Sequence, residues 1–382
     1  MKNTHKNVLT FFLSLILVFT LGCVSFDYIT TEIVVTPTPV AVQSATTESG
    51  IGNYFTPYFT SPPLDYETAG IEANLISFIE NAKVSVHGAF FEMDLPNVAD
   101  ALVSAAGNGI DVKLVYDNEQ MEKPERAHIL LDLADAGIPL VPDERSAFMH
   151  NKFFVIDGQI VWTGSFNITE NASHRNNENA VVFNVPELAQ NYEREFAEMF
   201  AGEFGPTSRS DTPYPLINFD GITVSNYFAP EDEVMSKVIA VVGGAKDSID
   251  FLSFSFTDVN LAYTMSELAL NDDISVQGVF ESSQSTGYSV CSYLQERGKN
   301  IEGNGKIVVK LDSNPGTMHE KVIIIDDRIV IFGSFNFSGN ADTSNDENLL
   351  IIDDLNLANQ FEQEFQKVFE AGIIPQDGCK KP

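Results

Sequence analysis

Short apolar runs alternate with amphipathic stretches along most of the chain. The runs AKVSVHGAFF, VKLVYD and KFFVID are typical of buried strands, whereas LPNVADALVSAAGNG has the apolar spacing of a helix. Strands that alternate with helices in this way predict layered α/β domains. Compact patterning begins near Tyr54. We therefore expect an α/β fold in which mixed sheets are flanked by helices.

The first 22 residues follow a different pattern. Lys2 and Lys6 precede an apolar run from Val8 to Leu21, which predicts a secretory signal peptide and is too short for a comfortable transmembrane helix. The string TLGC resembles a bacterial lipobox, which implies that Cys23 carries a lipid and becomes the mature N-terminus. Thr20 departs from the usual aliphatic residue, so an ordinary signal peptide or an uncleaved anchor stays open. In each case we expect an exported body, lipid-anchored on the outer face of the cell membrane or otherwise secreted.

Residues 23–50 are rich in Thr, Pro, Ser and Val and include TPTPVAVQSATTESG. They lack the periodicity of a core element, which predicts a flexible linker between the membrane and the folded body.

The folded body is a duplication. The segment from Met149 to Phe200 aligns without a gap on the segment from Met318 to Phe369, at a constant offset of 169 residues (150 to 319, 200 to 369). Upstream, YFTP in the first half is echoed by YFAP in the second. Two similar domains with a pseudo-two-fold arrangement are therefore predicted, at residues 51–206 and 213–374, joined near TSRSDTPYP.

Each half is expected to end in an amphipathic helix, ELAQNYEREFAEMF in the first and NLANQFEQEFQKVF in the second. Aromatic residues recur in both at helical spacing, which favours a place in the core over a binding role. These residues are Tyr192, Phe196, Phe200, Phe361, Phe365 and Phe369.

The two halves share one chemical motif, HNKFFVIDGQIVWTGSFN in the first and HEKVIIIDDRIVIFGSFN in the second. A histidine is followed two places on by lysine, seven places on by aspartate, and then by Gly-Ser-x-Asn. A chance match at six specified positions is rare, and two matches are rarer still. The first set is His150, Lys152, Asp157, Gly164, Ser165 and Asn167; the second is His319, Lys321, Asp326, Gly333, Ser334 and Asn336.

The spacing of the motif suggests what its residues do. Side chains two apart in a strand face the same side, so each histidine should lie beside its lysine, a phosphate-binding cation. Asp157 and Asp326 stand at turns, where they should brace the loop. Glu178 in NNEN and Glu347 in NDEN both follow their histidine by 28 residues (150 to 178, 319 to 347). We expect each glutamate to orient one of the histidines, although the sequence leaves open which glutamate serves which.

The motif resembles the HKD signature of the phospholipase D superfamily, and both copies are complete. The resemblance implies two α/β domains that meet at a shared cleft and a covalent phosphohistidine formed without a metal or other cofactor. By analogy, His150 is the nucleophile and His319 the general acid. Four residues are expected to bind the nonbridging oxygens, with hydrogen bonds added by Ser165 and Ser334. The four are Lys152, Lys321, Asn167 and Asn336.

Net charge and cysteine content restrict the binding partners and the covalent links that this chain is expected to have. The formal charge of −32 disfavours a general nucleic-acid coat, although local basic groups could still hold one phosphate. Besides Cys23 the chain has Cys291 and Cys379, which would form either a disulfide or two free thiols. A chain with both motifs need not dimerise to complete its site, so a monomer is expected.

Three functions remain. The first is a phospholipid phosphodiesterase that hydrolyses or transfers, which the predicted anchor and the acidic body favour. The second is a metal-independent nuclease, which the absence of a basic stripe in the sequence disfavours. The third is a non-catalytic binding protein at the cell surface, against which the intact motifs count. The remaining histidines of the folded body, His87, His128 and His174, match no motif and are interpreted as structural or surface residues.

Overall fold

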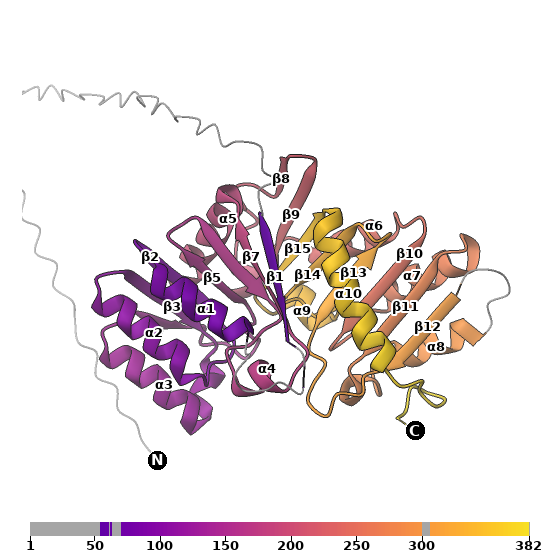
Figure 1. The fold of residues 1–382 in the computed structure, drawn as a ribbon, viewed down its shortest axis with the longest axis horizontal. Coiled ribbons are helices and arrows are strands. Elements are labelled where there is room, and N and C mark those ends of the chain that lie inside the picture. Colours follow the sequence, from indigo (N-terminus) through magenta and orange to yellow (C-terminus); the bar gives the residue numbers. More distant parts are fainter. Residues whose placement is uncertain (1–53, 61, 63–69, 300–305, 382) are drawn as a thin grey trace, which may run out of the picture. The chain divides into compact units, whose positions relative to one another are not determined.

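The computed structural model describes residues 54–60, 62, 70–299 and 306–381. The predicted signal peptide, the lipid attachment at Cys23 and the linker at residues 23–50 lie outside the described residues. Two mixed sheets with helices packed against them make up the described part (Figure 1). The predicted α/β fold class is therefore confirmed.

The sheet of the first half has the strand order β1-β7-β6-β5-β2-β3-β4. Strands β2, β3 and β4 run parallel, whereas β5, β6 and β7 form an antiparallel meander. The strands are β1 (Phe55–Phe59), β2 (Ser85–Phe90), β3 (Asp111–Tyr116), β4 (Leu140–Pro142), β5 (Lys152–Ile156), β6 (Ile160–Gly164) and β7 (Asn179–Asn184). The α-helices are α1 (Gly70–Asn81), α2 (Pro96–Gly107), α3 (Pro124–Asp135), α4 (Glu170–His174) and α5 (Pro186–Phe200).

The sheet of the second half repeats this plan, with the order β12-β11-β10-β13-β14-β15-β9-β8. Its strands are β8 (Leu216–Phe219), β9 (Ile222–Ala229), β10 (Ser248–Ser253), β11 (Ser275–Phe280), β12 (Lys306–Leu311), β13 (Lys321–Ile325), β14 (Ile329–Gly333) and β15 (Glu347–Asp353). Its α-helices are α6 (Val234–Val242), α7 (Val259–Asn271), α8 (Cys291–Lys299), α9 (Gly339–Thr343) and α10 (Leu355–Ala371).

Strand register extends the duplication upstream of the part that aligns without a gap. His87 on β2 pairs with Val155 on β5, and Asp250 on β10 pairs with Ile324 on β13. Because Val155 and Ile324 are aligned positions, His87 and Asp250 occupy the same place in the two sheets.

The two halves share one hydrophobic core. Phe183 of β7 stacks on Phe332 of β14 with ring centroids 6.2 Å apart, and Tyr192 of α5 meets Phe228 of β9 at 5.2 Å. Burial of these rings removes a large apolar area from water, which favours association of the halves. The described residues accordingly fall within one compact unit. The boundaries at 51–206 and 213–374 stay predictions.

The aromatic residues of the two terminal helices lie where the periodicity places them. Tyr192, Phe196, Phe361 and Phe365 are buried, while the last aromatic of each helix, Phe200 and Phe369, is only partly buried against the core.

Asp157 and Asp326 occupy the tight turns β5–β6 and β13–β14, in left-handed backbone conformation (φ 56° and 54°). The Asp157 carboxylate accepts the backbone N–H groups of Lys83, Val84 and Ser85 at 2.6–3.0 Å. Asp326 makes the same contacts with residues 246–248. Each aspartate therefore ties its turn to the start of β2 or β10, which is the bracing role expected.

Cys291 at the start of α8 and Cys379 near the C-terminus form a disulfide, with Cα atoms 5.9 Å apart. Of the two states that the sequence left open, the structure has the bonded one. Among the described helices, none combines the length and the apolar character needed to cross a bilayer.

Candidate active site

The two motif histidines lie on short segments that are hydrogen-bonded to the opposite half. The backbone N–H of His150, just before β5, donates to the carbonyl of Asp346 at 2.9 Å. The backbone N–H of His319, just before β13, donates to the carbonyl of Asn177 at 2.9 Å. Both side chains are 8% exposed, so both imidazoles are almost entirely removed from water.

Each histidine is paired with the glutamate of the other half. His150 Nδ1 lies 2.7 Å from Glu347 Oε2, and His319 Nδ1 lies 2.9 Å from Glu178 Oε2. The glutamates were expected to orient the histidines, and the structure settles which pairs with which. A carboxylate that accepts the Nδ1 proton leaves Nε2 as the nitrogen available for reaction.

The glutamates are held by their own half. Ser334 Oγ donates to Glu347 Oε2 at 2.7 Å, and Asn345 Nδ2 donates to Glu347 Oε1 at 3.1 Å. In the other copy, Ser165 and Asn176 make the same contacts to Glu178 at 2.7 and 3.1 Å. The two serine hydroxyls are fully buried, so their place differs from the expected contact with substrate: they support the glutamates instead.

The glycine that precedes each serine lets two strands approach closely. A Cβ added at Gly164 would lie 2.3 Å from the backbone oxygen of Asn179, and one at Gly333 would lie 2.3 Å from that of Asn348. Contacts this short are forbidden. Only glycine therefore fits, and the serine next to it is brought within reach of its glutamate.

The motif lysines are buried beside the histidines. Lys152 Nζ donates to the backbone oxygen of His150 at 2.7 Å, and Lys321 Nζ donates to that of His319 at 2.5 Å. Burial lowers the pKa of Lys152 to about 8 and that of Lys321 to about 7, even though glutamates near them act in the opposite direction. Neither ammonium group forms an ion pair within the described residues, so both charges are available to an anion.

Burial also dominates the protonation of the histidines. It lowers the pKa of His150 to about 4, against the attraction of Glu347 and with the repulsion of Lys152 and Lys321. The pKa of His319 is lowered by burial too, with repulsion from both lysines. The lysine of each motif therefore lowers the pKa of the histidine in the other motif, which means that the two motifs interact electrostatically. A bound phosphodiester anion would oppose these effects and favour a protonated imidazole.

Two phenylalanines that the sequence reasoning missed complete the walls of the site. Phe91 packs edge-on to His150 with ring centroids 4.9 Å apart, and Phe254 does the same to His319 at 4.8 Å. The ammonium groups of Lys152 and Lys321 lie 5.2 and 5.1 Å from the centres of these rings. The aligned strings AFF (89–91) and LSF (252–254) carried a signal, because in each a phenylalanine directly follows the strand.

Within the described residues, the two motif asparagines together make fewer side-chain hydrogen bonds than the two histidines or the two lysines do. Asn167 Nδ2 reaches Glu92 Oε2 at 3.4 Å, and the Oδ1 atoms of Asn167 and Asn336 are buried without a hydrogen-bond partner. Their expected contact with phosphate stays a prediction.

The fold and the site together define a duplicated α/β protein with one histidine, one lysine and one cross-paired glutamate from each half. The family described as "Cardiolipin synthase, PLD-like domain" matches residues 75–200 and 238–369. The chain belongs to this phospholipase D-like family, as the motifs indicated.

Comparisons with individual proteins agree with this assignment. A mitochondrial cardiolipin hydrolase from Xenopus tropicalis is 29% identical over 136 residues, which are 36% of this chain and 63% of that protein, less than two thirds of its length. A phospholipase D from Rickettsia bellii is 27% identical over 201 residues, 50% of this chain and 94% of that protein. The crystal structure of a phosphatidylserine synthase from Haemophilus influenzae Rd KW20 superposes with a TM-score of 0.64. The match covers 83% of this chain and 87% of that protein. Because the identity is 17%, this similarity supports the fold alone.

Proposed function

We propose that this protein is a phospholipid phosphodiesterase of the phospholipase D type, with one active site formed by both halves. The observation that carries the proposal is the reciprocal pairing of His150 with Glu347 and His319 with Glu178. This pairing orients two buried imidazoles in one site with two lysines. The names of the relatives, phospholipase D and cardiolipin hydrolase, support a phospholipid substrate.

The first chemical step forms a phosphohistidine. Nε2 of neutral His150 attacks phosphorus, so that a P–N bond forms while the P–O bond to the departing alcohol breaks. Protonated His319 donates its Nε2 proton to the departing oxygen. Lys152 and Lys321 stabilise the nonbridging oxygens, because their charges are held in a dry site before the substrate arrives.

The second step releases the product. Water, or an alcohol in the transfer reaction, gives its proton to His319 and attacks phosphorus, and the P–N bond to His150 breaks. The site then returns to its starting protonation state. The surroundings of the two histidines are nearly identical and do not distinguish the nucleophile from the general acid. His150 is assigned as the nucleophile by analogy with the family.

Export and lipid anchoring at Cys23 form part of the proposal, and they rest on the pattern of residues 1–23. A chain expressed in a bacterium with an alkyne fatty acid should carry the label, and Cys23→Ala should not. If neither protein carries the label, the remaining alternatives are a secreted form and an uncleaved anchor.

The substrate is tested with the folded body, phosphatidylcholine and ethanol. Phosphatidylethanol should form, and His150→Ala and His319→Ala should each abolish it. His128→Ala is the matched control, since its side chain is exposed on α3. Degradation of single-stranded DNA in the presence of chelator, without lipid turnover, would replace the proposal with a nuclease. Inactivity on both substrates, with no phosphohistidine trapped, would leave a binding protein.

A further inference from the structure

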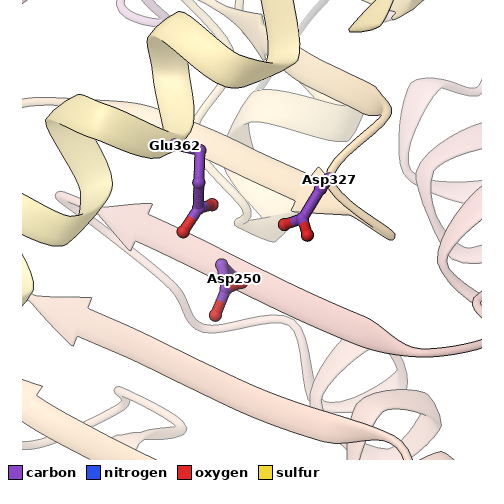
Figure 2. A group of neighbouring side chains, drawn as sticks. All are labelled: Asp250, Asp327 and Glu362. Atoms are coloured by element: carbon purple, nitrogen blue, oxygen red, sulfur yellow. The ribbon is translucent and has the colours of Figure 1, made fainter.

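Three carboxylates of the second half converge outside the active site. Asp250 comes from β10, Asp327 from the β13–β14 turn and Glu362 from α10. One oxygen of each lies within 4.8 Å of one oxygen of both others. Figure 2 shows the three side chains pointing toward one another from their three elements.

Two of these carboxylates have a buried oxygen without a partner. Asp250 is 4% exposed, and its Oδ1 has no hydrogen bond. Glu362 Oε1 accepts from Gln366 Nε2 at 2.7 Å, but its Oε2 is buried and unpaired. In the part of the chain that the structure describes, no lysine, arginine or histidine forms an ion pair with any of the three. A buried carboxylate normally has such a partner, because unpaired charge is costly to bury.

The first half shows how the same place is satisfied when a hydrogen-bonding partner for the glutamate is present. The positions equivalent to Asp250, Asp327 and Glu362 are His87, Gly158 and Glu193, by strand register and by the offset of 169. There, His87 Nδ1 pairs with Glu193 Oε2 at 2.7 Å. The second half keeps the glutamate, replaces the histidine by an aspartate and adds a further aspartate. It has thereby lost the histidine that pairs with the glutamate and gained two carboxylates.

The added aspartate, Asp327, has a left-handed backbone conformation, which glycine adopts most readily. Asp327 has φ 51°, and Gly158 has φ 62° in the same turn of the first half. A residue with a Cβ is strained in this left-handed conformation, although aspartate tolerates it better than most. Strain of this kind is often offset by a specific interaction of the side chain.

Like charges close together make the group costly without a counterion. One oxygen of each carboxylate lies within 4.8 Å of one oxygen of both others, so ionised groups here would repel one another at short range. A divalent cation at the centre would remove this repulsion and would give the unpaired oxygens a partner.

We propose that Asp250, Asp327 and Glu362 form a binding site for a hard divalent cation, Ca²⁺. Carboxylate oxygens without nitrogen or sulfur are the ligands that Ca²⁺ prefers, and Ca²⁺ accepts both monodentate and bidentate carboxylates. Asp327 is exposed, which gives water access to the remaining coordination positions.

The cation would join three elements of the second half. It would link β10, the β13–β14 turn and α10, where the first half has a direct side-chain pair between β2 and α5. Asp250 pairs with Ile324, which is three residues and roughly 10 Å along β13 from Lys321. The site is therefore structural, and turnover at temperatures well below unfolding should not depend on it.

The test uses the whole folded chain after removal of metal with EDTA and dialysis. At constant ionic strength, millimolar Ca²⁺ should raise the midpoint of thermal unfolding by a few degrees, and Mg²⁺ should raise it less. Calorimetric titration should find one Ca²⁺ site per chain. Asp250→Asn should abolish both effects. Glu370→Gln, an equal change of charge at an exposed position of the same helix, should keep them.

A second variant separates ion binding from general stabilisation. Asp250→His rebuilds the histidine–glutamate pair of the first half, so the metal-free protein should become more stable and lose its response to Ca²⁺. The proposal is overturned if Ca²⁺ leaves the wild-type midpoint unchanged, if Asp250→Asn responds as the wild type does, or if Mg²⁺ alone is effective. Because these measurements report binding and unfolding, their outcome is independent of the proposed phosphodiesterase activity.

Discussion

Glu347 belongs to the second half of the chain, and its carboxylate lies 2.7 Å from Nδ1 of His150 in the first. Burial acts to raise the pKa of Glu347, but His150 and Lys152 outweigh it and hold that pKa below its usual range. Glu347 is thus a carboxylate that accepts the Nδ1 proton of His150. In the equivalent pair, Glu178 of the first half accepts from His319 of the second, so each half supplies the glutamate for the other half's histidine.

Replacement of Glu347 by glutamine should reduce kcat by about 10² to 10⁴, with little change in KM, because the neutral amide no longer stabilises the charged imidazole or enforces the Nδ1–H tautomer. Steady-state kinetics on the lipid substrate measure this. Glu187→Gln, on the exposed side of α5, is the control and should be neutral. An unchanged kcat in Glu347→Gln would show that the pairing has no part in catalysis.

The pH dependence of kcat/KM should be bell-shaped with a maximum below about pH 7. The acidic limb reflects protonation of the nucleophile, since burial lowers the pKa of His150 to about 4. The alkaline limb reflects loss of the proton from the acidic histidine and from the lysines, whose pKa values of about 7 (Lys321) and about 8 (Lys152) are lowered by burial. A plateau that extends above pH 9 would contradict this assignment.

Lys321→Arg tests whether loss of the lysine charge causes the fall of kcat/KM at alkaline pH. Arginine keeps its proton throughout this range, so the decline of kcat/KM above pH 7 should become shallower, although the maximum should fall because the guanidinium fits the site poorly. Lys306→Arg, on the exposed edge strand β12, should leave the profile unchanged. An alkaline limb of the same steepness in both variants would assign that limb to the histidine alone.

Asp157→Asn should lower the free energy of unfolding by about 2 kcal/mol at pH 7, because a neutral amide with one oxygen replaces a carboxylate that accepts several backbone N–H groups. These hydrogen bonds hold the pKa of Asp157 below its ordinary value although burial opposes them. The stabilisation is therefore present above about pH 4 and is lost as pH falls through the lowered pKa. Urea unfolding at pH 7 and pH 3 should show the difference between variant and wild type shrinking with acidification. Asp135→Asn, at an exposed helix end, is the control and should unfold as the wild type does.

Removal of the disulfide by Cys291→Ser with Cys379→Ser should lower the free energy of unfolding by about 2 to 5 kcal/mol, because the bond closes a loop across 88 residues of sequence and limits the unfolded chain. Urea unfolding with and without reductant measures the effect. Reductant should shift the wild type to the value of the double variant and leave the double variant unchanged. Turnover at 25 °C should persist in both.

The sequence alone determined the local features of this protein. Strand and helix periodicity predicted the layered α/β halves, and the constant offset identified the duplication. The spacing of His150 and Lys152 predicted that the two residues lie side by side, and the turn position of Asp157 indicated its bracing role. These predictions succeed because they depend on residues close together in the chain, whose relative positions the backbone geometry of strands and turns largely dictates.

Only the tertiary structure decided which distant segments meet. The sequence placed Glu178 and Glu347 at equal distances from their histidines, yet each pairs across the interface with the opposite half. The same holds for Ser165, which supports a glutamate rather than the substrate, and for Asp250, which meets two carboxylates from other elements. Such contacts arise from the packing of two sheets on one shared core, and packing depends on the shapes of all the faces brought together, which no local spacing encodes.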